Sequence, residues 1–499
     1  MFEKTNGIAK IKDGKLQGLK CTRNPSVWAF LGIPYADDPV GENRWRAPQP
    51  VKPWDGVRDA THYAPDCPQV TLPKGSFYQV EFYPNEKVMN EAGSLALNVW
   101  TPAKAGEALP VLVWIHGGAF REGSGGALQF IGETLAAKGI VVVTINYRMG
   151  ALGFMAHPEL TREGGGASGN YAFMDQIAAL QWVHDNIADF GGDPAKVTID
   201  GQSAGSMSVS AMMAAEQAKG LFRGAIGQSA AAFGRQMANA TLADAEEMGL
   251  KLQEALGCKN LAQLRERTPQ EIMDATDEHG LWFRPIVDGK VISEDYLSRF
   301  ASGAQSHVSV IMGATSDEDA LHQTQEDDYA NYLAEAKNFG KYEEEFKRVF
   351  PAANNEEAGR AVSWVRTART FAGMRMTAQF QMAQGCDAYL YSFTQNLPCP
   401  DGSTLRPFHS AELVYQFGTL YTGWRPWREE DLAASELMMR YWANFVSTGD
   451  PNGEGLPVWE KHAVGDGRCM HLCANAGMAG VPRGEQVDFM EKCIREGIL

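Results

Sequence analysis

The stretch Lys196–Gly205, KVTIDGQSAG, decides the fold class of this 499-residue chain. A short β-branched run leads into Gly201-Gln202-Ser203-Ala204-Gly205, and a helical pattern resumes after Gly205. Strand, tight turn and helix are the context in which a G-x-S-x-G motif presents a nucleophilic serine at the carboxyl edge of a sheet. The flanking glycines are needed because strand and helix crowd this turn. The alternative interpretation is a glycine-rich loop whose serine only caps the helix.

Strand and helix patterns alternate on both sides of this motif. The strand patterns are Val111–Ile115, Ile140–Tyr147, Val308–Met312 and Asp387–Phe393. Residues 175–187 carry apolar side chains at helical spacing and end before a Gly-Gly-Asp-Pro stop. We therefore expect an α/β fold with a mostly parallel central sheet and helices on both faces. The charged segment 319–375 predicts a helical insertion beside that sheet and beside the active site, and since no linker interrupts the chain, we expect one domain, 1–499.

Charge and cysteine content bear on partners and compartment. The chain has 45 Lys and Arg against 61 Asp and Glu, a net charge of −16, which disfavours nucleic acid and anionic membrane surfaces as partners. No apolar signal region begins the sequence and no apolar run reaches membrane-spanning length, so we expect a cytoplasmic protein, although a trimmed signal would leave no trace. The eight cysteines form no CxxC pair, and we expect neither a metal site nor a cofactor. The oligomeric state is left open.

A second motif strengthens the catalytic interpretation of Ser203. His116-Gly117-Gly118-Ala119 directly follows the strand pattern Val111–Ile115. In hydrolases of this architecture that position supplies backbone N–H groups to an oxyanion hole. Such pre-positioned donors stabilise the negative charge of a tetrahedral intermediate, each by roughly 3 kcal/mol. Gly117 would support the loop by allowing close backbone approach.

A nucleophilic serine also needs a base and an acid, which follow it in the order Ser, Asp/Glu, His in this fold class. Of the late histidines, His409 stands in a short loop, Arg406-Pro407-Phe408-His409, before a helical pattern, and is the candidate base. The candidate acids Asp317, Glu318 and Asp319 follow the strand pattern Val308–Met312. The spacing alone does not choose among the three carboxylates.

Taken together, these motifs and several others make the chain similar to the type-B carboxylesterase family, the cholinesterase-like branch of the α/β-hydrolases. The resemblance spans nearly the whole length and rests on FLGIPYA (30–36), GNYAFMDQIAALQWVHDNIADFGGDP (169–194), the serine turn, FHSAEL (408–413) and TGDPN (448–452). It implies an α/β-hydrolase fold and a triad of Ser203, Glu318 and His409. It also implies oxyanion donors at Gly118, Ala119 and Ala204, and a supporting serine at Ser229.

The chain departs from the family pattern in several places. Gln202 replaces the usual glutamate before the nucleophile. Ser94 stands where the family has the cysteine partner of Cys67, so we expect a free thiol at Cys67. Ala92 replaces an acid, which leaves Arg44 without its expected ion pair. No tryptophan lies between Trp54 and Trp100, so choline esters are not the expected substrates.

The sequence thus predicts a serine carboxylic ester hydrolase that forms an acyl-enzyme on short-chain or aryl esters. The alternatives are an amide, carbamate or lactone hydrolase or an acyltransferase with the same triad, and a non-catalytic adhesion or scaffold relative. A segment near 67–92, which in the family folds over the active-site mouth, carries four rings that we expect to line the substrate entrance. These are Phe77, Tyr78, Phe82 and Tyr83.

Overall fold

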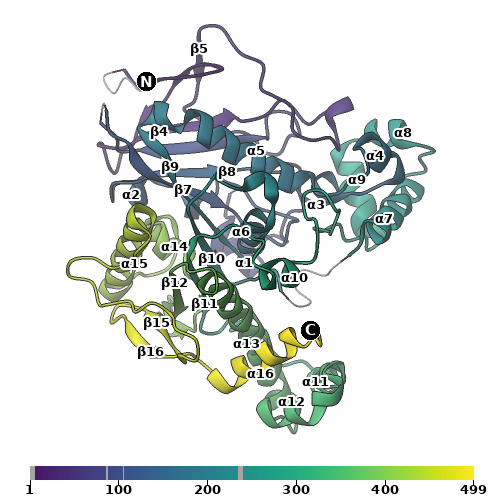
Figure 1. The fold of residues 1–499 in the computed structure, drawn as a ribbon, viewed down its shortest axis with the longest axis vertical. Coiled ribbons are helices and arrows are strands. Elements are labelled where there is room, and N and C mark those ends of the chain that lie inside the picture. The colour runs from purple at the N-terminus through teal and green to yellow at the C-terminus, as the bar shows by residue number, and fades with distance from the viewer. Residues whose placement is uncertain (1–5, 86–87, 105, 234–239) are drawn as a thin grey trace.

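The computed structural model describes residues 6–85, 88–104, 106–233 and 240–499. An 11-stranded sheet runs through it in the order β16-β15-β12-β11-β10-β9-β7-β8-β6-β4-β3 (Figure 1). From β8 through β7, β9, β10, β11 and β12 to β15, every neighbouring pair is parallel, and the pairs at both ends are antiparallel. The sheet is therefore mostly parallel, as the sequence predicts.

The elements have the following bounds. The strands of the large sheet are β3 (Leu19–Lys20), β4 (Trp28–Pro34), β6 (Ala96–Thr101), β7 (Leu109–Ile115), β8 (Val141–Ile145), β9 (Gly192–Gln202), β10 (Gly224–Gln228), β11 (Ser309–Thr315), β12 (Ala388–Phe393), β15 (Arg468–Leu472) and β16 (Gly477–Gly480). The smaller sheets hold β1 (Ile8–Ile11), β2 (Gly14–Gln17) and β5 (Val57–Asp59), and the pair β13 (Leu397–Pro398) and β14 (Thr404–Leu405). The helices are α1 (Phe77–Phe82), α2 (Glu133–Ala136), α3 (Gly150–Phe154), α4 (Pro158–Glu163), α5 (Tyr171–Asn186), α6 (Ala204–Ala214), α7 (Leu242–Ala255), α8 (Leu261–Arg265), α9 (Pro269–Glu278), α10 (Tyr296–Ala301), α11 (Asp328–Asn338), α12 (Glu343–Val349), α13 (Asn355–Met382), α14 (Leu413–Gln416), α15 (Glu429–Thr448) and α16 (Gly484–Arg495).

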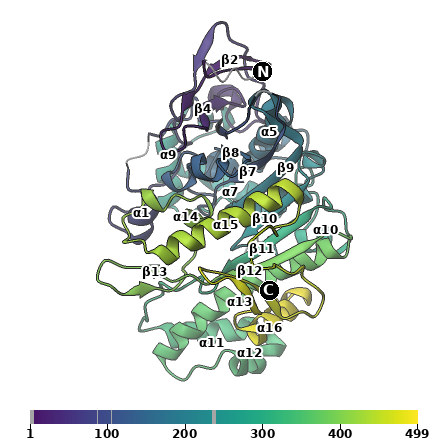
Figure 2. The same cartoon turned by 90° about the vertical axis from the view of Figure 1, so that its left-hand side faces the viewer.

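The sheet separates two hydrophobic cores. Along β7, Val111, Val113 and Ile115 face one core, and Leu112 and Trp114 face the other, because successive side chains of a strand point to opposite faces. Helices α5, α6 and α13 contribute to the first core, and α14 and α15 to the second. Figure 2 shows α15 crossing over the sheet, on the face that carries the second core. Helices on both faces explain why the central strands are apolar on both faces.

The segment 319–375 is helical from Asp328 onward for most of its length, but it differs from the insertion beside the sheet that the sequence predicts. Its first helices, α11 and α12, lie at the end of the molecule away from the N-terminus (Figure 1). The 28-residue α13 packs against β11 and β12. These two strands are parallel neighbours, and parallel neighbours require a crossover connection, which is usually a helix. Helix α13 is therefore that crossover and part of the core architecture, not an insertion.

The sequence also predicts wrongly that Arg44 lacks an ion pair. Its Nε donates to Glu91 Oε1 at 2.7 Å, and both side chains are buried. Glu91 lies one residue before position 92, where the family acid was expected. The loop brings the Glu91 carboxylate to the Arg44 guanidinium. Cys67 is a free thiol, as expected, and so are the other seven cysteines. Within the described ranges, no helix is both long and apolar enough to cross a membrane.

Candidate active site

The serine turn has the tight geometry that its glycines predict. Ser203 lies between β9 and α6 with φ 58° and ψ −127°, a conformation that costs non-glycine residues of the order of 1–3 kcal/mol. A Cβ on Gly205 would lie 2.0 Å from the carbonyl oxygen of Ile115, and one on Gly201 would lie 2.4 Å from that of Gly205. Both positions therefore require glycine, and the crowding fixes the serine at the strand end.

The loop after β7 lies beside this turn. A Cβ on Gly117 would lie 2.5 Å from the carbonyl oxygen of Gln202, so the two loops touch through their backbones. Gly118 has φ 104°, and a Cβ there would meet the carbonyl oxygen of Glu122 at 2.0 Å. Ala119 follows with φ 54°. The backbone N–H groups of Gly118 and Ala119 donate no hydrogen bond to other described residues. Both can therefore serve a bound oxyanion.

His409 connects the serine to a buried carboxylate. Its Nε2 lies 2.9 Å from Ser203 Oγ, and its Nδ1 lies 2.5 Å from Glu318 Oε2. The backbone N–H of His409 also donates to the carbonyl oxygen of Glu318, at 3.2 Å. The three side chains come from positions 203, 318 and 409, so only the fold brings them into one chain of contacts. Gln202 Nε2 lies 3.3 Å from His409 Nε2, which places this amide beside the imidazole.

The surroundings of Glu318 keep it ionised. Burial raises the pKa of this carboxyl, but the nearby His409 and hydrogen bonds from His409, Ser229 and Thr315 outweigh burial and lower it. Oε1 accepts from the Thr315 amide at 2.8 Å, from the Thr315 hydroxyl at 2.8 Å and from Ser229 Oγ at 2.7 Å. An ionised carboxylate only accepts hydrogen bonds, so His409 Nδ1 carries the proton and Nε2 presents its lone pair to Ser203.

The other two carboxylates of the acidic triplet point elsewhere. Asp317 is buried and forms an ion pair with Arg406, and it accepts from Ser363 Oγ at 3.3 Å. Asp319 lies 3.3 Å from Arg366 Nη1. Only Glu318 of the three contacts His409 among the described residues. The tertiary structure thus distinguishes carboxylates that the sequence spacing could not.

A second buried carboxyl, which the sequence does not predict as a site residue, lies close to the triad. Glu412 Oε1 lies 3.2 Å from Ser229 Oγ, the hydroxyl that bonds to Glu318. Burial, followed by the negative charge of Glu318, raises the pKa of Glu412 to about 8. Burial and Glu318 therefore favour the neutral form of Glu412, and Glu318 is the carboxylate that contacts His409. No periodicity singles Glu412 out, since it sits one turn beyond His409 in an ordinary helical pattern.

A cavity of about 650 Å³ opens onto Ser203 and His409. Glu318, Ser229, Ala119 and Ala204 also line it, whereas Gly117, Gly118 and Gln202 are not among its lining residues. The remaining lining includes apolar side chains and a group of charged ones. The apolar ones are Phe120, Met207, Trp282, Val362 and Val365. The charged ones are Arg284, Glu335, Arg366 and Arg369. None of these residues is among the site residues that the sequence predicts.

The four rings of the mouth segment do not line this cavity, contrary to expectation. Three of them, Phe77, Tyr78 and Phe82, pack on Phe408, the residue before His409. Phe77 lies 4.9 Å from the Phe408 ring centroid in an edge contact, Tyr78 6.4 Å and Phe82 6.5 Å. The Tyr78 hydroxyl donates to the carbonyl oxygen of His409 at 3.4 Å. Because α1 lays its rings onto this loop, they contact the His409 segment rather than the substrate space.

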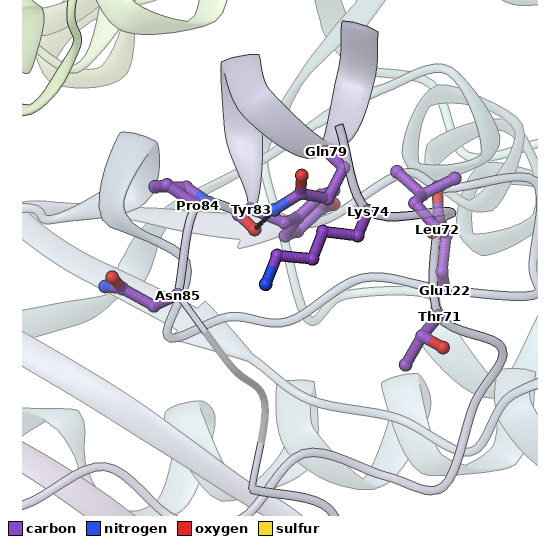
Figure 3. A pocket seen from close by; sticks show the side chains of 8 residues that line it. All are labelled: Thr71, Leu72, Lys74, Gln79, Tyr83, Pro84, Asn85 and Glu122. Atoms are coloured by element: carbon purple, nitrogen blue, oxygen red, sulfur yellow. Dashed lines mark hydrogen bonds between the residues drawn. The ribbon is translucent and has the colours of Figure 1, made fainter. Parts of the chain in front are cut away.

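Tyr83 lines a different cavity, of about 460 Å³, between the mouth segment and Glu122 (Figure 3). Lys74 and Gln79 extend along this cavity near Tyr83 in the close-up view. Ser203 and His409 are not among its lining residues. This second cavity is therefore separate from the one that holds the triad side chains.

Among the described residues, no group of three or more His, Cys, Asp or Glu side chains could hold a metal ion.

The sequence does contain a pattern that could have identified part of the cavity lining. Positions 362, 365, 366, 369 and 370 recur at helical spacing and form one face of α13. No comparable pattern marks Trp282 and Arg284, which lie in an irregular segment.

The chain is similar to known carboxylesterases over most of its length. Residues 5–490 match the model of the carboxylesterase family. The chain is 35% identical to fumonisin B1 esterase of Sphingopyxis macrogoltabida, over 91% of this chain and 84% of that protein. It is 32% identical to para-nitrobenzyl esterase of Bacillus subtilis, over 91% of this chain and 92% of that protein.

A solved structure of a PNB esterase superimposes with a TM-score of 0.84 at 30% identity, covering 99% of both chains. That likeness confirms the α/β-hydrolase fold. With the family match over nearly the whole length, the conclusion is that the chain belongs to the type-B carboxylesterase family and is a serine carboxylic ester hydrolase.

Proposed function

We propose that this enzyme hydrolyses short-chain or aryl carboxylic esters through Ser203, His409 and Glu318 and an acyl-enzyme intermediate. The observation that carries the proposal is the unbroken chain of contacts from Ser203 Oγ through both ring nitrogens of His409 to Glu318. Residues 1–499 act in it as one catalytic domain, because both hydrophobic cores share the sheet that carries these residues.

The proton moves with the reaction. Ser203 Oγ attacks the ester carbonyl carbon while His409 Nε2 takes the hydroxyl proton. His409 then gives that proton to the leaving alkoxide, and the C–O bond breaks to leave the acyl group on Ser203. Water attacks the acyl carbonyl by the same route, and His409 returns the proton to Ser203 Oγ. Glu318 holds the Nδ1–H tautomer and stabilises the imidazolium throughout.

The oxyanion would be held by the backbone N–H groups of Gly118, Ala119 and Ala204. Ala119 and Ala204 line the cavity on either side of Ser203, and Ala204 is the first residue of α6. The first N–H groups of a helix have no partner within it, so they are available to an anion. Ser229 and Gln202 would support the triad, Ser229 through Glu318 and Gln202 through the imidazole.

The size and lining of the cavity support small esters. A space of about 650 Å³ with Phe120, Met207 and two valines suits an aryl or medium alkyl group. A similar protein is named for para-nitrobenzyl esters, whose alcohol group carries an aromatic ring. Amides, carbamates, lactones or an acceptor alcohol could use the same machinery, and no contact in the cavity favours them. A non-catalytic role is disfavoured because all three triad side chains are present and in contact.

A graded panel of p-nitrophenyl and hydroxycinnamate esters tests the proposal. Ser203→Ala and His409→Ala should each lower kcat by several orders of magnitude without unfolding the protein, since nucleophile and base act as a unit. Glu318→Gln should cost less but still orders of magnitude, and the matched control Asp317→Asn far less. Greater damage from Asp317→Asn than from Glu318→Gln would overturn the assignment of the acid.

The same panel tests the substrate class. We expect a higher kcat/KM for short-chain and aryl esters than for an emulsified long-chain triglyceride. The rate on a short-chain ester should also rise smoothly through its solubility limit. A rate jump at that limit, or a preference for the triglyceride, would instead identify a lipase.

A further inference from the structure

The charged side chains that line the cavity are mostly basic, whereas the chain as a whole is acidic. The chain carries an excess of acidic residues, 61 against 45 basic ones. The lining, in contrast, has three guanidinium groups, those of Arg284, Arg366 and Arg369, and two carboxylates, those of Glu318 and Glu335. One of the carboxylates, Glu318, is already engaged by His409. The lining of the space next to Ser203 therefore carries one more positive than negative side chain, although the chain as a whole is acidic.

Two of these arginines are presented by one helix face. Arg366 and Arg369 stand with Val362, Val365 and Thr370 on the side of α13 that borders the cavity. The Arg366 side chain is 55% exposed, whereas that of Arg369 is 19% exposed. Arg366 thus lies at the opening, and Arg369 lies deeper. Arg284 lines the same cavity from the irregular segment before Pro285.

Carboxylates in the protein neutralise these arginines only in part. Arg369 Nη2 lies 2.6 Å from Glu335, but its buried Nε has no hydrogen-bond partner among the described residues. Arg366 contacts Asp319 at 3.3 Å, in a pair that is open to solvent. Arg284 forms no ion pair with any described residue, and its guanidinium lies 5.9 Å from the Trp282 ring. Arg284 therefore keeps its donors for an incoming anion, and the half-exposed Arg366 can share its own.

We propose, building on the proposed esterase function, that this cavity selects esters that carry a free carboxylate in addition to the scissile ester bond. A guanidinium presents two parallel N–H donors that match the two oxygens of a carboxylate. In a partly water-excluded space such a charged hydrogen bond is stronger than at the surface. Valines and Trp282 would contact the carbon chain, while Arg284 and the α13 arginines bind the acid group.

Matched ester pairs test this selectivity. In the first set, mono-p-nitrophenyl esters of dicarboxylic acids of four to eight carbons are compared with p-nitrophenyl esters of the monocarboxylic acids of equal length. In the second set, 4-carboxyphenyl butanoate is compared with 4-carbamoylphenyl butanoate. We expect kcat/KM to favour the anionic member by roughly tenfold in at least one pair, the value of one charged hydrogen bond. Added salt should reduce that ratio.

Variants separate the arginines from general damage. Arg284→Gln and Arg366→Gln should each lower the anionic-to-neutral ratio of kcat/KM several-fold. The control is Arg360→Gln, which removes an exposed arginine of α13 that pairs with Glu356 and does not line the cavity. It should leave the ratio unchanged. An equal loss of ratio in Arg360→Gln would mean that overall charge, and not the cavity, sets the preference.

The outcomes distinguish this inference from the proposed function. Hydrolysis that needs Ser203 but shows no anionic preference in any pair would overturn the carboxylate inference and leave the esterase function in place. If no ester is hydrolysed, the esterase proposal fails. Binding of the corresponding 4-nitroanilides to Ser203→Ala, measured by calorimetry, then decides the cavity question. Tighter binding of the carboxylate-bearing anilide would support a cationic site, and equal binding would refute it.

Discussion

The mouth segment 67–92 and the helical segment 319–375 exchange the roles that their compositions suggest. The mouth segment is rich in aromatic rings, yet three of the four pack on Phe408 and none lines the cavity at Ser203. The helical segment is highly charged, yet one face of its long helix α13 lines that cavity. Composition indicates what a segment can contact. The direction in which its backbone carries the side chains decides what it does contact.

Each segment also contacts a different member of the triad, either His409 or Glu318. The mouth segment reaches His409, through the Tyr78 hydroxyl and through the rings on Phe408. The helical segment reaches Glu318, whose backbone N–H donates to Thr367 Oγ1 at 3.0 Å. Base and acid are thus positioned from two sides, by one contact set that is aromatic and one that is polar.

The largest expected effect concerns how the two segments are anchored. Glu81 of α1 forms a buried ion pair with Arg425, at 2.8 Å. Glu81→Gln would leave a buried guanidinium without its countercharge, and we expect a loss of about 3 kcal/mol in the free energy of unfolding, measured by urea denaturation. The control in the helical segment is Glu356→Gln, whose pair with Arg360 is exposed and should matter by less than about 0.5 kcal/mol. Equal losses would contradict the contrast in burial.

A second, smaller effect tests whether the mouth rings act on His409 or on substrate. Phe77→Ala removes an edge contact with Phe408, and we expect a loss of roughly 1–2 kcal/mol in stability and a several-fold fall in kcat with little change in KM. Val80→Ala, an exposed change on the same helix, is the control. A rise in KM for aryl esters at unchanged kcat would instead show that the rings contact the substrate.

A third prediction concerns the neutral carboxyl beneath the acid. The pKa of Glu412 is raised from 4.5 to about 8, so between about pH 5 and pH 8 the folded protein holds a proton that the unfolded chain has lost. Stability contributed by this group therefore falls as pH rises through that window and is constant above it. Glu412→Gln removes this titrating group. The Tm of the variant minus the Tm of the wild type should therefore increase from pH 5 to pH 8.

The control for this pH series is Glu254→Gln, an exposed change on α7. Its Tm should follow that of the wild type at every pH. A constant Tm difference between Glu412→Gln and the wild type across the series would show that Glu412 is already ionised at pH 5.

The smallest effect is expected from reductant. Ion pairs and rings, and not a disulfide, hold the mouth segment, because Cys67 is a buried free thiol. Dithiothreitol should leave Tm and activity unchanged, and thiol titration of the unfolded, unreduced protein should find all eight cysteines. Six thiols or fewer would reveal a disulfide and change the view of how this segment is anchored.

Local crowding and chain order allowed the sequence by itself to determine a large part of this protein. The glycines around Ser203 and in the loop after β7 are dictated by backbone contacts shorter than any Cβ allows, so their pattern identifies both loops. Continuous apolar strands between helical patterns likewise determine a mostly parallel sheet, since only burial on both faces tolerates them.

The family resemblance pointed to Glu318, but residue spacing left the three carboxylates equivalent, and the tertiary structure decided which of them contacts His409. It alone decided which acid pairs with Arg44 and which side chains face the cavity. Asp317, Glu318 and Asp319 are equivalent in spacing, and the direction of each depends on partners such as Arg406 and Thr367 that are distant in sequence. The rings of α1 and the arginines of α13 could each have faced the substrate. Helix orientation relative to the sheet settled that, and it results from packing over the whole core, which no local pattern encodes.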